Sequence, residues 1–141
     1  MSIKTNGSRQ YPLVARLPIS FDDLALADAG VAQVGFNLPG GSTIIGGAVV
    51  VSTVFNSSGG TPLDTLDVGD SIDPDRYTAS AVDLTSLGRT ALTLTGYETV
   101  GGTTVDVTWD NGTATTLPTT GEAYVEIQYV QLDRANENVP G

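Results

Sequence analysis

Apolar and polar residues alternate with a period of two along most of this chain. From Leu13 to Phe21 every second residue is apolar. The same alternation recurs in shorter runs, which contain Val34 to Leu38, Leu66 to Val68, Leu92 to Leu94, Val105 to Trp109 and Val125 to Tyr129. A period of two is typical of β-strands that bury one face. We therefore predict an all-β fold of about seven or eight strands, arranged as a two-sheet antiparallel sandwich that is jelly-roll-like, with a β-barrel as the alternative.

Turn and cap residues locate several boundaries of these strands. Pro18 has no N–H to donate to a neighbouring strand, so the run from Leu13 to Phe21 is predicted to be an edge strand. Asn111-Gly112 is a strong signal for a hairpin turn. The segment from Asp83 to Gly88 is predicted to form one helical turn, with Asp83 as its cap and Gly88 as its end. No helix of ordinary length is expected.

The segment from Thr43 to Phe55 differs from the others because it is apolar on both faces. Ile45, Val49, Val51 and Phe55 fall on one face, and Ile44, Ala48, Val50 and Val54 fall on the other. Such a strand lies in the centre of a sandwich or is covered by another subunit. We therefore take Val49, Val50, Val51 and Val54 as interface candidates and predict a homo-oligomer, either a dimer or a trimer. Gly46-Gly47 predicts a bend or bulge in this strand.

The chain length and the ends of the pattern indicate a single domain. A chain of 141 residues can bury a core without disulfides or metals. We place an N-terminal arm at residues 1–12, the β-sandwich domain at 13–132 and a C-terminal tail at 133–141. The arm and the tail are polar, and such ends can reach for a partner.

Composition excludes most catalytic chemistry. The chain has no His and no Cys, so Ser-His-Asp triads, Cys-His pairs and the usual zinc sites cannot form. We predict no catalytic residue and no cofactor, and therefore no enzyme. Six Lys and Arg against 16 Asp and Glu give a net charge of −10, so no nucleic-acid partner is expected. No apolar run approaches the length of about 20 residues that crosses a membrane, and the polar N-terminus does not read as a signal peptide.

One acidic segment could bind a metal. Asp67, Asp70, Asp73 and Asp75 lie close together and are followed by Arg76. Calcium prefers six to eight oxygen ligands, which an acidic loop can supply. The spacing does not match an EF-hand, however, because no Glu occupies the twelfth position. Turn formation, with Arg76 neutralising a neighbouring carboxylate, is the favoured interpretation, and a Ca²⁺ site is the alternative.

Several motifs resemble a family of small structural proteins of tailed bacteriophages. They are Val-Gly-Asp-Ser-x-Asp-Pro-Asp-Arg-Tyr at 68–77, Gly-Arg-Thr-Ala-Leu-Thr-Leu-Thr-Gly-Tyr at 88–97, the strand ending in Trp109, and the ending Arg134 with Glu137-Asn138. The resemblance spans most of the chain but carries no defined binding residues. It implies a non-enzymatic virion protein, most commonly a cement or decoration protein that binds the major capsid protein. The protein would then stabilise the shell from the capsid exterior and occupy the host cytoplasm during assembly.

Two other functions remain open at this stage. A receptor-binding domain of a phage tail or head fibre, of the carbohydrate-binding class, would expose aromatic side chains at loop tips. The candidates are Tyr77, Tyr97, Trp109, Tyr124 and Tyr129. A carboxylate-driven glycosidase would need two acidic side chains facing each other across a cleft, and nothing in the sequence pairs them.

Overall fold

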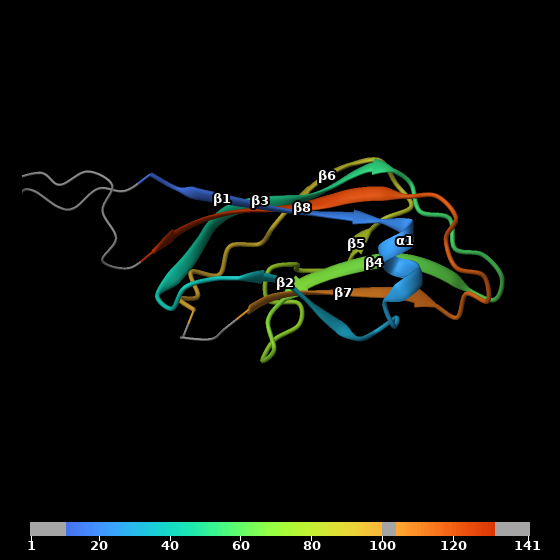
Figure 1. The fold of residues 1–141 in the computed structure, drawn as a ribbon, viewed down its shortest axis with the longest axis horizontal. Helices are drawn as coiled ribbons and strands as arrows, with labels where there is room; N and C mark the ends of the chain where they lie inside the picture. The colour runs from blue at the N-terminus through green and yellow to red at the C-terminus, as the bar shows by residue number, and fades with distance from the viewer. Residues whose placement is uncertain (1–10, 100–103, 132–141) are drawn as a thin grey trace, which may run out of the picture.

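The fold is an all-β sandwich, as the alternation predicted. The computed structural model describes residues 11–99 and 104–131. Apart from Tyr11 and Pro12, the predicted arm and tail therefore lie outside the described residues. Two antiparallel sheets face each other as two layers, and one short helix lies at one end between them (Figure 1).

The described part of the chain is made of β-strands and one short helix. In chain order the elements are β1 (Leu13–Ser20), α1 (Phe21–Leu26), β2 (Ala32–Asn37), β3 (Ser42–Thr53), β4 (Pro62–Gly69), β5 (Val82–Asp83), β6 (Gly88–Ala91), β7 (Thr104–Gly112) and β8 (Glu122–Gln131). One four-stranded sheet has the order β1-β8-β3-β6, which we call the first sheet. The second sheet has the order β2-β7-β4-β5. Strand pairs 1–8, 2–7, 3–6 and 4–5 are therefore neighbours.

The hydrophobic core fills the space between the two sheets. The inward residues of the central strands are almost completely buried, among them Val49 and Val125 of the first sheet and Leu66 and Val68 of the second. In β4 and β8 the outward residues between them are half-buried or exposed, so these two strands show the alternation seen in the sequence. Burying one such side chain stabilises the fold by about 1.5–3 kcal/mol.

The edge-strand prediction for Pro18 and the bulge prediction at Gly46-Gly47 are both confirmed. β1 is the edge of the first sheet, and the register of β3 against β8 shifts between Ile44 and Gly46. The shift reverses the expected faces, because Ile44 is buried and Ile45 is exposed. Gly47 is required here, since a Cβ on it would lie 2.3 Å from the carbonyl oxygen of Glu126.

Two local predictions are wrong. Asp83 does not begin a helical turn: its carboxylate accepts hydrogen bonds from the N–H and hydroxyl of Thr85, and Gly88 opens β6 instead. A turn does follow β7, in which the Ala114 N–H donates to the Asn111 carbonyl. It is not a β7–β8 hairpin, however, because these strands belong to different sheets.

The short helix α1 connects the edge strands of the two sheets. Ser20 caps it, with the side chains of Ser20 and Asp23 each bonded to the other residue's backbone N–H in a capping box. Leu24 is the buried residue of the helix. As Figure 1 shows, α1 leads the chain from the end of β1 in one layer to β2 in the other.

Candidate contact surfaces

The outer face of the first sheet carries a row of apolar and aromatic side chains. Tyr124 in β8 pairs with Pro18 of β1 on one side and with Val50 of β3 on the other, and Val50 in turn pairs with Arg89 of β6. We call Pro18, Tyr124 and Val50 the outer row. Their strand neighbours Ile19, Val125 and Val49 are buried, so the outer row faces away from the core.

The side chain of Arg16 lies over the Tyr124 ring in the middle of the outer row. The guanidinium carbon of Arg16 lies 4.1 Å from the centre of the Tyr124 ring, and Arg16 also forms an ion pair of 2.9 Å with Glu126. The hydrogen bond with Glu126 raises the pKa of Arg16, so Arg16 keeps its charge. The first sheet thus presents a surface on which Arg16 and Arg89 stand beside Glu122 and Glu126.

The four valines proposed as interface residues lie on different sides of β3. Val49 and Val51 belong to the hydrophobic core, where they contact the second sheet's layer. Val50 lies in the outer row and is half-buried, and Val54 is half-buried just after the end of β3. A partner can therefore reach Val50 and Val54 without opening the sandwich.

The outer face of the second sheet is acidic. Its strands contain Asp67, Asp83 and Asp110 at outward positions that are half-buried or exposed, and no Lys or Arg, whereas the outward Asp106 is buried. Their direction follows from the register, since the neighbouring residues Leu66 and Trp109 point into the core. The two faces of the molecule therefore differ in charge: the first is mixed, and the second is negative.

The acidic segment forms a turn around a buried ion pair. Asp70 is almost inaccessible to solvent, bonds the Arg76 side chain, and accepts hydrogen bonds from the N–H groups of Ile72 (2.9 Å) and Asp73 (2.8 Å). Burial opposes ionisation of Asp70, but these donors together lower its pKa. The Arg76 guanidinium also stacks 3.8 Å from the ring centre of Tyr97. Turn formation, the favoured interpretation of this segment, therefore accounts for Asp70 and Arg76.

The other three carboxylates do not join Asp70 in a cage. Asp67 accepts a hydrogen bond from the Thr78 hydroxyl, and burial raises its pKa. Asp73 lies beside Asp75, and the hydrogen bond between their carboxyl groups raises the pKa of Asp73. Within residues 11–99 and 104–131, no group of three or more His, Cys, Asp or Glu side chains could hold a metal ion.

Most of the aromatic candidates have structural partners. Trp109 is buried, and its indole N–H donates to Asp64 (3.4 Å). Tyr77 is buried as well, and burial raises its pKa to about 12. Tyr97 and Tyr124 stack against arginines. Trp109 and Tyr77 therefore cannot line a sugar site, and no observation favours the carbohydrate-binding alternative.

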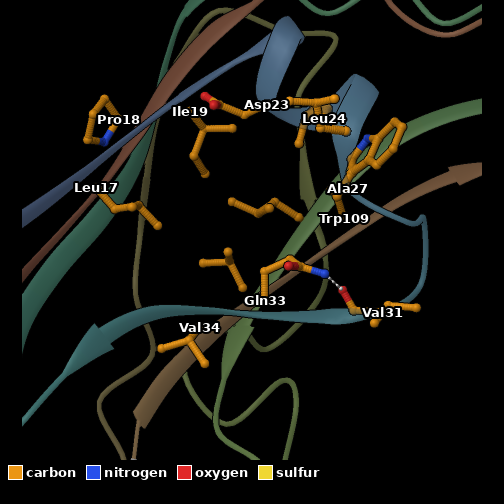
Figure 2. Close-up of a pocket in the computed structure, with 13 residues that line it drawn as sticks. Leu17, Pro18, Ile19, Asp23, Leu24, Ala27, Val31, Gln33, Val34 and Trp109 are labelled. Carbon is orange, nitrogen blue, oxygen red and sulfur yellow. Dashed lines mark hydrogen bonds between the residues drawn. The ribbon is translucent and has the colours of Figure 1, made fainter.

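A groove lies on the open side of the sandwich, where the edge strands β1 and β2 do not pair. It has a volume of about 300 Å³ and is bounded by β1, α1 and β2 (Figure 2). Its floor is apolar and includes Leu24, Leu66 and Trp109. Leu26 and Val31 lie at its mouth and are 89% and 49% exposed. The sequence did not reveal this groove, because it arises from two strands that meet only in the tertiary fold.

The chain is similar in fold to parts of two phage capsids. One is from the cyanophage Pam1 capsid asymmetric unit, with a TM-score of 0.60, 24% sequence identity, and coverage of 92% of this chain and 91% of that chain. The other is from the capsid of Ralstonia phage GP4, with a TM-score of 0.58, 20% identity, and coverage of 93% and 90%. No protein-family model and no curated protein matches the sequence. Among the described residues, no helix is long and apolar enough to span a bilayer.

Proposed function

We propose that this protein is a non-enzymatic structural component of a phage virion, and more narrowly a cement or decoration protein. It binds the major capsid protein on the outer surface of the shell and stabilises the shell. The observation that carries the proposal is the likeness in fold to chains of two phage capsids, which covers nine-tenths or more of each chain. The motifs at 68–77 and 88–97, which resemble those of phage structural proteins, support the same role.

The surface best suited to the shell is the outer face of the first sheet. It combines an aromatic residue, Tyr124, with the apolar Pro18 and Val50 and with the exposed guanidinium of Arg16. Tyr and Arg are enriched at the centres of protein interfaces, where they contribute most of the binding energy. The mixed charges of this face also impose no strong repulsion on a partner. The acidic face of the second sheet would then point to solvent.

The experiment is to add the purified protein to shells that lack it. We expect saturable attachment with a fixed number of copies per capsomer and a higher temperature of shell disruption. Val50→Asp should reduce attachment by about tenfold or more while the protein stays folded, because it places a carboxylate in an apolar contact, where docking would have to remove its water. Ile72→Asp is the matched control, since Ile72 is exposed in the turn after β4, outside the first sheet. Failure of the wild type to attach, or equal attachment of both variants, would contradict the proposal.

A further inference from the structure

The groove between β1 and β2 has features of a binding site for an extended segment of chain. β1 and β2 are both edge strands, so each has one row of backbone N–H and C=O groups without a strand partner. An added strand can bind to such an edge while its side chains enter the neighbouring groove. Figure 2 shows Leu17 and Ile19 of β1 and Gln33 of β2 directed into the same space.

The charges around the groove restrict the kind of segment that fits. Asp22, Asp23 and Asp28 lie in or beside α1 and are exposed, and residues 17–34 contain no Lys or Arg. An apolar groove with an acidic rim favours a segment that has apolar side chains flanked by cations.

The N-terminal arm of this chain has that composition. Residues 1–10 contain Lys4 and Arg9, two of the six cations of the chain, and no acidic residue. Ile3 stands directly before Lys4 and can supply an apolar anchor. The arm is thus a segment of positive charge in a protein whose net charge is −10.

The arm of the same molecule is poorly placed to reach its own groove. Asn6-Gly7 is the turn signal of the arm, and a two-residue turn there would set Ile3 opposite Gln10. To set Ile3 beside Leu17, the chain would have to reverse around Gln10, where no Gly, Asn or Asp stands. Pro12 also disfavours a helical conformation at Tyr11, which makes a tight reversal of the chain at this point less favourable.

We propose that the groove between β1 and β2 binds the N-terminal arm of a second copy of this chain. Ile3 inserts between Leu26 and Val31, and Lys4 faces the acidic rim. The copies are joined by exchange of arms, which accounts for a dimer or a closed ring of three. The contact forms in solution and does not depend on the shell, so its failure would leave the proposed attachment to capsids untouched.

Cysteine cross-linking gives the direct test, since the chain has no Cys of its own. Thr5→Cys labels the arm and Gln33→Cys labels the groove. The two single variants are mixed and oxidised, and we expect a cross-linked heterodimer. A mixture of Thr5→Cys with Leu87→Cys should give at least about tenfold less cross-linked heterodimer. Leu87 is exposed beside β6, at the edge of the first sheet opposite β1. A variant that carries both Thr5→Cys and Gln33→Cys reports contact within one molecule. Cross-linking in that variant alone, or no cross-linking in any sample, would overturn the proposal.

A second measurement uses a matched pair of surface substitutions. Leu26→Lys removes an apolar contact at the groove and repels a basic arm, whereas Leu87→Lys makes the same change far from it. Both positions are exposed, so both variants should fold. We expect Leu26→Lys, and deletion of residues 2–9, to raise the dissociation constant of the oligomer by about tenfold or more in light scattering. An unchanged dissociation constant for Leu26→Lys or for the deletion would refute the arm exchange. An effect of Leu87→Lys equal to that of Leu26→Lys would refute it as well.

Discussion

Asp64 is a single side chain whose role depends on its partners in the fold. It lies in β4 and is almost fully buried. Its carboxylate accepts hydrogen bonds from the N–H (2.8 Å) and the hydroxyl (2.6 Å) of Ser57 and from the indole of Trp109. Asp64 therefore ties the loop after β3 to the core of the second sheet. Sequence periodicity places Asp64 on the face of Leu66, but it gives no hint of these donors.

Replacing this carboxylate should destabilise the fold. Asp64→Ala leaves the Trp109 and Ser57 donors without an acceptor in a buried site, and we expect a loss of about 2–3 kcal/mol. Asp28→Ala, at an exposed position after α1, should change the free energy of unfolding by less than about 0.5 kcal/mol. Urea unfolding followed by the single Trp measures both. Equal stability of the two variants would show that Asp64 has no structural role.

At the scale of elements, the sequence indicates strands well and connections poorly. The inward positions of β4, β7 and β8 follow directly from alternation, because a half-buried strand must alternate. The face of Ile44 could not be predicted, since a bulge inserts one residue and reverses every side chain before it. The helix α1 does have a signal in the sequence, because Ser20 and Asp23 have the spacing of a capping box. The groove could not be predicted from periodicity, because it requires knowing which strand edges meet.

Asp67 in β4 and Asp70 in the turn after β4 give predictions about pH that have opposite signs. The donors around Asp70 lower its pKa, so its carboxylate stabilises the fold above the unfolded pKa of about 3.9. That stabilisation is lost as the pH falls through the lower, folded value. Burial raises the pKa of Asp67, so its charge costs stability at neutral pH, and protonation relieves this cost as the pH falls through the raised value.

Substitutions at these two positions test the signs. At pH 7, Asp70→Asn should lower the midpoint of thermal unfolding and Asp67→Asn should raise it. The Asn oxygen can still accept from Thr78, so Asp67→Asn keeps the hydrogen bond that Asp67 makes. Both differences in unfolding midpoint from the wild type should shrink as the pH is lowered. The difference for Asp67→Asn should shrink first. Calorimetric scans between pH 7 and pH 3 measure them, and a destabilising Asp67→Asn at pH 7 would contradict the assignment.

At the scale of the whole molecule, charge is divided between the faces and the ends. The second sheet is acidic on its outer face, the first sheet is mixed, and the arm is basic. Leu13 pairs with Tyr129, so β1 begins where β8 ends. A shell contact through the outer row and an arm exchange through the groove would therefore use different surfaces. One molecule could make both contacts at once.

Salt separates attachment through the first sheet from attachment through the acidic face. A contact built on Pro18, Tyr124 and Val50 depends on apolar burial, so its affinity for shells should change less than about threefold between 0.05 and 0.5 M salt. Asp75 is exposed, and its negative charge contributes to the raised pKa of Asp67. Asp75→Lys should leave the affinity for shells unchanged. It should, however, slow the migration of the decorated particles toward the anode, because each bound copy then loses one negative charge and gains one positive charge at a surface that faces solvent. If the acidic face docks on the shell instead, raised salt and Asp75→Lys will each release the protein, since both remove attraction to basic groups on the partner.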